Sequence, residues 1–238
     1  MPNYVTSTCR LIGPDEDVAR FRSEIIRTAP AGHSDAGGLL FDFDAVIPMP
    51  SCLRDADESS RSELGMSLVT ARGSTPPPFS KLGLYDNQIE WVRSKAGLPY
   101  DAGIGEVAAA FLLKHPEIEQ MGMSRIRALA ETGFASWYPW ALANWGTKWG
   151  AFRFAETGAE PFAFRFETAW SFPVPIFEAL ATRFPSLGFE CATFDEGWNF
   201  AGAGWFNPPA GEPCFAECEA SATLYKVVYG RPPEPDED

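Results

Sequence analysis

The chain has 238 residues, of which 45% are hydrophobic and 14% aromatic, and its formal net charge at pH 7 is −13. A chain of this length can bury a core without disulfides or metals, and its apolar content excludes an intrinsically disordered protein. The negative charge disfavours a conventional nucleic-acid binder, because phosphate groups would be repelled. It suits contact with a basic partner instead.

Cysteines and histidines are the residues most able to hold a metal. The chain contains Cys9, Cys52, Cys191, Cys214, Cys218, His33 and His115. Their spacing matches no zinc-binding pattern, so we expect no metal and no cofactor. No secretory leader opens the sequence, and no segment approaches the roughly 18 apolar residues of a membrane span. A cytoplasmic protein without membrane association is therefore expected.

The first fifty residues show strand and helix patterns in turn. Residues 3–13 alternate apolar and polar positions, which predicts a strand. Residues 14–29 open with acids and then repeat apolar residues at helical spacing, which predicts a helix. Residues 37–50 predict a second strand, with two phenylalanines on one side and Asp42 and Asp44 on the other.

The middle of the chain is expected to form a mostly helical insertion, residues 51–143. Its first part, 51–83, is polar and rich in proline, which favours loops and a short helix at most. Helical periodicity then predicts helices over 85–97, 104–116 and 124–133.

After the insertion the strand pattern returns. Strands are predicted over 150–158, 160–170, 187–197 and 200–209, and a helix over 174–186. This order predicts an α+β protein, a ferredoxin-like mainly antiparallel sheet with helices on one face and a helical insertion. The sheet domain is expected to comprise residues 1–50 and 144–230. Residues 231–238 are expected to form a disordered acidic tail.

The tryptophan-rich stretch WYPWALANWGTKWG, residues 137–150, has two readings. In the structural reading, Gly146 adopts a left-handed conformation and closes a short helix. Trp145 and Trp149 then pack around the junction between insertion and sheet, with Lys148 over an aromatic face or in solvent. In the functional reading, the same residues form part of a binding site.

Four separated segments also carry a family resemblance. They are MPNYVTSTCRLIGP, FDFDAVIPMP, NWGTKWG and FETAWSFPVPIFEALATRFPSLGFE, in that order. Together they resemble the YubB-type family of plasmid- and phage-encoded proteins, whose function is unknown. The resemblance implies a C-terminal ferredoxin-like domain and a mobile-element setting, and it implies no catalytic residue. The chain departs from the family pattern at Gly150, where relatives often have Asn, and at Phe172, where they have a second Pro.

Polar groups embedded in these aromatic motifs suggest a binding site, because packing alone would not require them. The candidate residues are Asn144, Thr147, Lys148, Trp149, Trp170, Ser171, Glu196, Asn199 and Trp205. The last three of these, Glu196, Asn199 and Trp205, come from the stretch DEGWNFAGAGWFN, where a glycine-rich hairpin packed under aromatics is the alternative explanation.

Motifs for catalysis are weak. If their strands adjoin, Asp42 or Asp44 can pair with Arg165 in an ordinary cross-strand ion pair, an interpretation preferred to a catalytic dyad. The sequence contains no G-x-S-x-G elbow and no phosphate-binding loop. His33 and His115 are read as exposed or capping residues.

These observations favour a non-enzymatic accessory protein of a plasmid or prophage that binds another, possibly basic, protein. The alternative is a small-molecule sensor or enzyme that uses the Trp/Asn/Lys/Glu cluster. A deep pocket whose charged residues have strongly perturbed pKa values would favour the alternative, whereas a flat exposed patch would favour a protein partner.

Overall fold

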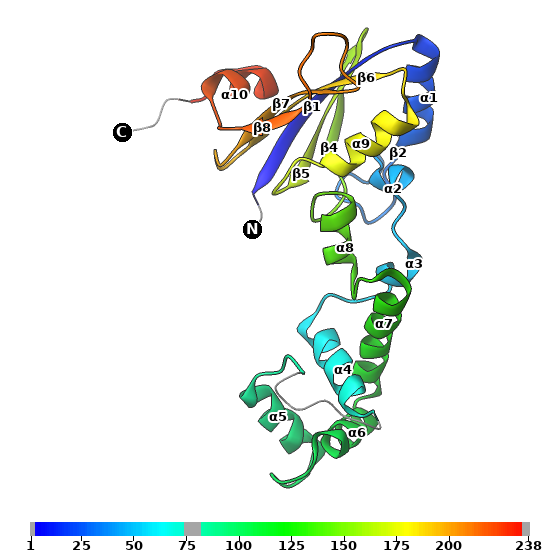
Figure 1. Ribbon diagram of the computed structural model, residues 1–238, viewed down its shortest axis with the longest axis vertical. Coiled ribbons are helices and arrows are strands. Elements are labelled where there is room, and N and C mark those ends of the chain that lie inside the picture. Colours follow the sequence, from blue (N-terminus) through cyan, green and yellow to red (C-terminus); the bar gives the residue numbers. More distant parts are fainter. Residues whose placement is uncertain (1–2, 74–81, 235–238) are drawn as a thin grey trace. The chain divides into compact units, whose positions relative to one another are not determined.

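The computed structural model describes residues 3–73 and 82–234 (Figure 1). The chain divides into two compact units. The sheet unit contains the described residues 3–48 and 141–234, and the helical unit contains 49–73 and 82–140. Each unit has its own hydrophobic core, so each is described by itself.

The sheet unit is built on one six-stranded sheet with the order β4-β5-β1-β6-β7-β8. The strands are β1 (Tyr4–Ile12), β4 (Phe152–Ala159), β5 (Phe162–Ala169), β6 (Gly188–Asp195), β7 (Ala201–Phe206) and β8 (Ala216–Cys218). All neighbouring strands pair antiparallel. The α+β class is thereby confirmed. With helices α1 (Asp15–Ile25) and α9 (Val174–Arg183), the order β4-β5-β1-β6 reproduces the split β-α-β arrangement of ferredoxin-like sheets.

One face of the sheet carries an aromatic core. Alternation along β5 points Phe164 and Phe166 to the same side, where both are fully buried. Phe21 of α1 lies 6.0 Å from the Phe164 ring and 5.9 Å from the Phe189 ring, centroid to centroid. Phe177 of α9 lies 6.1 Å from both Phe166 and Phe189. These phenylalanines anchor both helices to the sheet.

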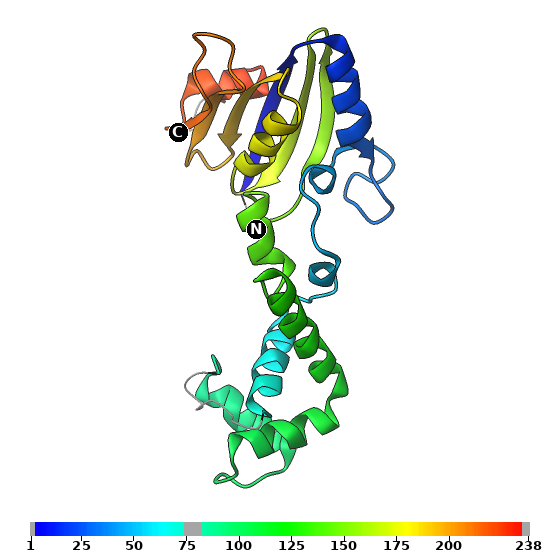
Figure 2. The same cartoon turned by 45° about the vertical axis from the view of Figure 1, so that its right-hand side comes forward.

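The other face is partly covered by a helix that the sequence did not predict, α10 (Ala222–Tyr229). Its Ser221 cap accepts a hydrogen bond from Leu224 N, which satisfies one free amide of the first turn. Val228 packs with Phe194 and Ala201 in a small second core. The helix therefore lies on the face opposite α9, as the turned view shows (Figure 2).

The predicted strand over 37–50 is wrong in its second half. The chain instead forms β2 (Ile26–Thr28), β3 (Leu39–Phe41) and α2 (Phe43–Val46), and β2 and β3 pair in a separate two-stranded sheet. The Asp42 side chain accepts a hydrogen bond from Asp44 N and so starts the helix. This capping converts an apparent strand alternation into a helical turn whose phenylalanine is buried.

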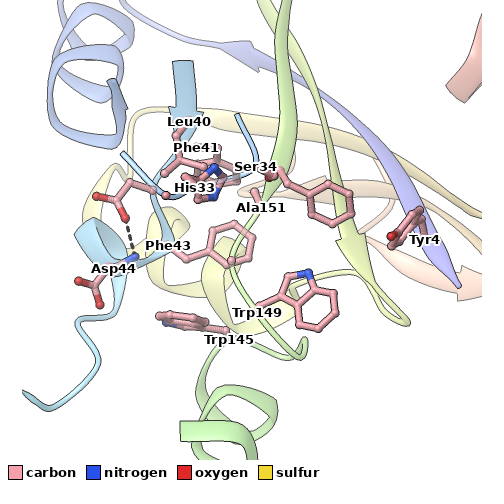
Figure 3. A pocket seen from close by; sticks show the side chains of 14 residues that line it. Tyr4, His33, Ser34, Leu40, Phe41, Phe43, Asp44, Trp145, Trp149 and Ala151 are labelled. Carbon is pink, nitrogen blue, oxygen red and sulfur yellow. Dashed lines mark hydrogen bonds between the residues drawn. The ribbon is translucent and has the colours of Figure 1, made fainter. Parts of the chain in front are cut away.

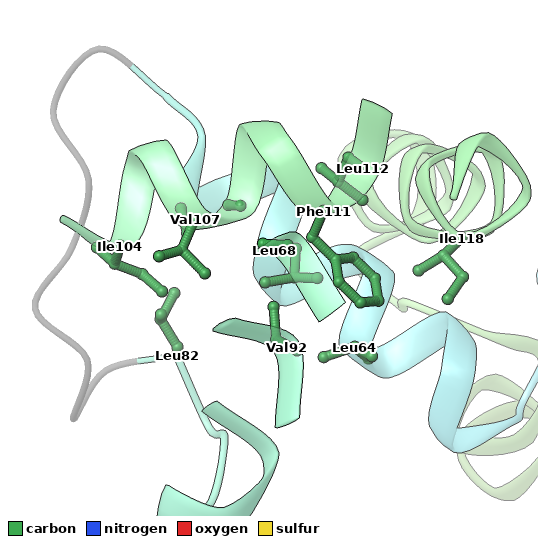
Figure 4. Packing of buried hydrophobic residues seen from close by; sticks show 12 residues of the cluster. Leu64, Leu68, Leu82, Val92, Ile104, Val107, Phe111, Leu112 and Ile118 are labelled. Atoms are coloured by element: carbon green, nitrogen blue, oxygen red, sulfur yellow. The ribbon is translucent and has the colours of Figure 1, made fainter. Parts of the chain in front are cut away.

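The helical unit packs around a cluster of aliphatic residues and one phenylalanine (Figure 4). Its helices are α3 (Ser51–Arg54), α4 (Ser60–Ala71), α5 (Asp86–Ala96), α6 (Ile104–Lys114) and α7 (Pro116–Thr132). The labelled core residues are Leu64, Leu68, Leu82, Val92, Ile104, Val107, Phe111, Leu112 and Ile118. Leu82 lies in the turn before α5, and the others come from α4, α5, α6 and α7, so the unit buries its apolar side chains within itself.

The expectation of a short helix at most between 51 and 83 is corrected by α4, a helix of 12 residues. The sequence pattern does not predict this helix, because only one narrow side of it is buried and most of its other residues are polar. Ser59 caps the first turn by accepting from Ser62 N. Gly65 lets the backbone approach α7 so closely that a Cβ added at Gly122 would lie 2.2 Å from Gly65 C.

Three further helix boundaries follow from proline and glycine. The helix predicted over 124–133 begins earlier, at Pro116, which occupies its first turn and needs no amide donor there. Gly133 ends that helix with a φ of 80°, in the left-handed region. Gly146, with a φ of 77°, follows α8 (Trp137–Asn144) and donates to Ala141 O, which confirms its predicted role.

The C-terminal tail is only partly described. Residues 231–234 form neither helix nor strand, and residues 235–238 lie outside the described part of the chain, so the disorder of the tail stays a prediction. Among the described helices, none combines the length and apolar character needed to cross a bilayer.

Candidate binding site at the Tyr4 end of the sheet

An aromatic pocket of about 470 Å³ opens in the sheet unit at the Tyr4 end of β1 (Figure 3). Its lining includes six aromatic side chains, from Tyr4, Phe41, Phe43, Trp145, Trp149 and Phe152. Its polar lining comes from His33, Ser34, Asp42 and Asp44. We refer to this cavity as the aromatic pocket.

Trp145 and Phe43 form the floor of the aromatic pocket, and both are held in place from behind. The Trp145 indole Nε1 donates to Ile47 O at 2.9 Å, so its only polar atom is satisfied. The rings of Phe43 and Trp145 lie 6.1 Å apart at 72°. Both side chains are nearly fully buried. The floor is therefore rigid and apolar.

Trp149 forms one wall, and Lys148 braces it. The Lys148 ammonium lies 4.9 Å from the centroid of the Trp149 ring and 4.8 Å from that of the Trp170 ring. Contacts of this kind stabilise by about 0.5–1 kcal/mol each at exposed sites. Lys148 thus links the two indoles, and it confirms the expectation that this lysine covers an aromatic face.

Tyr4 also lines the pocket, and two hydrogen bonds to Glu196 hold its backbone in place. Tyr4 N donates to the Glu196 carboxylate at 2.7 Å, and Glu196 N donates to Tyr4 O at 3.0 Å. The Tyr4 and Phe152 rings meet edge to face at 5.1 Å. Arg153 lies over the Tyr4 ring at 5.3 Å from its centroid. Glu196 therefore positions a wall of the pocket rather than lining it.

The polar end of the pocket contains two aspartates and a histidine. Asp42 lies 3.5 Å from the Arg27 guanidinium, so the predicted pairing of Asp42 with Arg165 is wrong. The reason is that Asp42 does not lie in the main sheet. Asp35 N donates to His33 Nδ1 at 3.1 Å, so the neutral imidazole carries its proton on Nε2.

Of the described non-glycine residues with a positive φ, Asn207 lies at the far end of the sheet and the others lie at the Tyr4 end. Arg153, Trp170 and Trp198 all have positive φ angles, of 50°, 69° and 58°. Bulky residues rarely adopt this conformation, and it costs roughly 1–3 kcal/mol per residue. Such strain is found most often at functional sites. Trp170 N donates to Asn3 O at 3.0 Å, a bond that helps hold the strained residue beside Lys148.

Several of the predicted site residues meet at this end of the sheet, in different roles. Lys148, Trp149, Trp170 and Glu196 surround or line the aromatic pocket. Thr147 donates to Ala169 O at 2.7 Å, and Ser171 donates to Gly146 O at 2.5 Å, so both tie the tryptophan segment to the end of β5.

The remaining predicted residues lie apart from the pocket lining. Asn199 Nδ2 donates to the Asp195 carboxylate at 2.6 Å, within the turn after β6. Asn144 is the last residue of α8. Trp205 pairs in register with Glu190, and Glu190 with Arg10, six residues along β1 from Tyr4. At about 3.3 Å per residue, Trp205 lies roughly 20 Å away, at the other end of the sheet.

Sequence reasoning missed most of the pocket lining. The sequence pattern places Asp42, Asp44 and His33 at the surface and Phe43 in a strand, whereas all four line the pocket. The sequence does hold one signal, since aspartate is a favoured N-cap residue and Asp42 caps α2. Within the described residues, no group of three or more His, Cys, Asp and Glu side chains lies close enough to hold a metal ion.

Comparison with known proteins adds one structural likeness. No family model matches the chain, and no curated protein sequence does. The fold is similar to the crystal structure of a protein api92 from Yersinia pseudotuberculosis, of the DUF1281 family. The two share 10% sequence identity and a TM-score of 0.39, over 93% of this chain and 99% of the other. The role of the pocket is therefore inferred from this chain's own residues.

Proposed function

We propose that the aromatic pocket binds a small planar organic molecule that carries amino groups at one end. The observation behind this proposal is the division of the lining, with six aromatic rings around the cavity and two aspartates at its polar end. Ligand sites typically combine such an apolar wall with a few polar groups that set orientation. The cavity volume of about 470 Å³ lies within the usual range of such sites, roughly 300–1,000 Å³.

The charges around Trp149 favour a neutral ring over an organic cation. Lys148 already occupies one side of the Trp149 indole at 4.9 Å. A second cation stacked on the same indole would be repelled by that ammonium. A neutral aromatic ring stacks on the indole without this penalty. Its amino groups can then donate to the carboxylate of Asp42 or Asp44, the acceptors at the polar end.

This proposal develops the alternative that the sequence left open, a small-molecule sensor or enzyme. It specifies the binding of a ligand and names no reaction. A plasmid or prophage setting, which the YubB-type resemblance implies, stays a prediction. The same is true of the basic protein partner. A cavity rather than a flat patch beside Trp149 supports ligand binding as the first function to test.

The test compares amino-substituted rings with their unsubstituted parents. Adenine and 2-aminobenzothiazole, which are uncharged at neutral pH, would be titrated against purine and benzothiazole, with binding followed by calorimetry. We expect the amino compounds to bind about tenfold more tightly, which corresponds to one hydrogen bond of roughly 1.4 kcal/mol. Absence of binding by all four rings would overturn the proposal.

Two variants locate the binding. Trp149→Leu should weaken binding about tenfold or more because the stacking wall is lost. Asp42→Asn keeps a capping side chain on α2 and should reduce the preference for amino compounds while leaving binding of the unsubstituted rings unchanged. The control is Trp91→Leu, which removes a half-exposed tryptophan of the helical unit. Equal effects of Trp149→Leu and Trp91→Leu would contradict a pocket at this position.

A further inference from the structure

The edge of the sheet far from the aromatic pocket is formed by β8. This strand pairs with β7 through Ala216, Glu217 and Cys218, and it is the last strand in the order of the sheet. All three residues are exposed. Within the described residues, the second side of β8 therefore presents backbone donors and acceptors to which another strand can pair.

An apolar groove of about 460 Å³ runs between this edge and α9. Its floor is made by Phe206 and Phe215, whose rings are stacked 5.3 Å apart. Phe215 is held from below by Phe172, at 4.4 Å. Two carboxylates, of Glu178 and Glu217, lie at its lining. We call this cavity the edge groove.

The surroundings of the edge groove are strongly acidic. From Phe184 to Tyr225 the sequence contains no lysine and no arginine. Of the six acids in this stretch, Glu190 pairs with Arg10, and Asp195 and Glu196 lie at the Tyr4 end of the sheet. The other three lie close to β8. Glu212, Glu217 and Glu219 are exposed around β8. Negative potential concentrated at one edge favours a positively charged partner.

We propose that an extended segment of a basic partner protein adds to the sheet beside β8. Backbone hydrogen bonds to the β8 edge would supply affinity, and side chains that enter the groove would supply specificity. Residues two apart in a strand point to the same side. The segment that fits has an apolar residue for the Phe206 and Phe215 floor and, two positions away, a Lys or Arg for Glu217 or Glu178.

The experiment uses the full chain and a fluorescently labelled peptide, KTVTRTVTK, in which valine and arginine alternate on one face. Binding would be followed by fluorescence anisotropy at low salt. Because β8 is short, we expect the dissociation constant of the basic peptide to lie roughly in the micromolar range. Two further peptides test the mode of binding. One replaces the basic residues by glutamate, and the other replaces the central threonines by proline, which removes the amides that pair with an edge. Both altered peptides should bind at least about tenfold more weakly than the basic peptide.

Charge reversal on the protein locates the surface. Glu217→Lys should weaken binding of the basic peptide about tenfold, and the matched control Glu90→Lys, an exposed acid of α5, should leave it unchanged. Trp149→Leu should also leave it unchanged, so that this surface and the aromatic pocket are tested separately. The proposal is overturned if the basic peptide does not bind, if the proline peptide binds equally well, or if both charge reversals have the same effect.

Discussion

At the scale of single residues, the structure changes the meaning of several side chains without changing their chemistry. Lys148 has the aromatic contact that its neighbours in sequence suggest, whereas Asp42 becomes a helix cap and a pocket residue. Cys9 and Cys191 lie opposite each other in β1 and β6, with sulfur atoms 3.4 Å apart and almost no exposure. Nothing in the local sequence around either cysteine indicates this pairing.

The buried cysteine pair predicts a pH dependence of stability. Burial raises the pKa of the Cys191 thiol well above its ordinary value of 9.0, and the neighbouring Cys9 adds to the shift. In the unfolded chain the Cys191 thiol loses its proton near pH 9.0, whereas in the folded chain the thiol is still protonated at that pH. The free energy of unfolding should therefore fall as the pH rises above about 9, by up to ~1.4 kcal/mol per pH unit.

Urea unfolding at several pH values between roughly 8 and 10.5 would measure this pH dependence, because the thiol of the unfolded chain titrates over that range. The double variant Cys9→Ala, Cys191→Ala should show a flatter dependence, whatever its overall stability. Cys218→Ala, at an exposed position, serves as the control and should keep the steep slope. An identical slope in all three proteins would show that other groups cause the loss.

At the scale of elements, close approach decides the packing of the helical unit. The helices α4 and α7 cross where Gly65 faces Gly122, with no side chain between the backbones. The sequence shows two isolated glycines in polar surroundings, which favour a loop. Only the partner helix explains them, because each glycine makes room for the backbone of the other.

Gly122→Ala tests this crossing. The added Cβ would lie 2.2 Å from Gly65 C and 2.4 Å from Gly65 O, and backbone cannot move aside cheaply. We expect the free energy of unfolding of the helical unit to fall by about 1–3 kcal/mol, despite the higher helix propensity of alanine. Thermal unfolding followed by circular dichroism would measure it.

The control for this crossing is Gly103→Ala, at the start of α6, where an added Cβ would meet nothing within 4 Å. Its effect should stay below about 1 kcal/mol. Equal destabilisation by the two variants would mean that the glycines matter through backbone conformation and not through close approach.

At the scale of the whole molecule, the chain forms two units with separate cores. The helical unit buries Leu68, Val107 and Phe111 completely within its own cluster. The main sheet buries its phenylalanines against α1 and α9. Each unit therefore has the apolar contacts that independent folding requires.

Excision of residues 49–140 tests this independence. The isolated fragment should show a helical circular dichroism spectrum and a cooperative thermal transition, because the cluster that stabilises it is internal. Leu68→Ala should lower the midpoint of that transition, since a fully buried leucine is removed. A fragment that is helical but melts without cooperativity would argue against a separate core.

Much of the fold follows from local patterns. The first strand, the β4-β5 hairpin, α9 and the Gly146 helix stop were predicted because alternation, helical spacing and glycine placement act within a few residues. The α10 helix, β8 and α4 were missed, since short or polar elements have a weak periodic signal and are stabilised mainly by packing. The second half of the predicted strand at 37–50 failed because a single cap outweighed the strand alternation.

The sequence by itself determined the α+β class, because the order of strand and helix patterns restricts which sheets the chain can form. It also marked the tryptophan segment as unusual. Only the tertiary structure decided which residues share a cavity with Trp149. Asp42 and Tyr4 are more than a hundred residues away in sequence, and no local signal carries such a contact. The edge groove arises in the same way, since it exists only where β8, Phe206 and α9 come together.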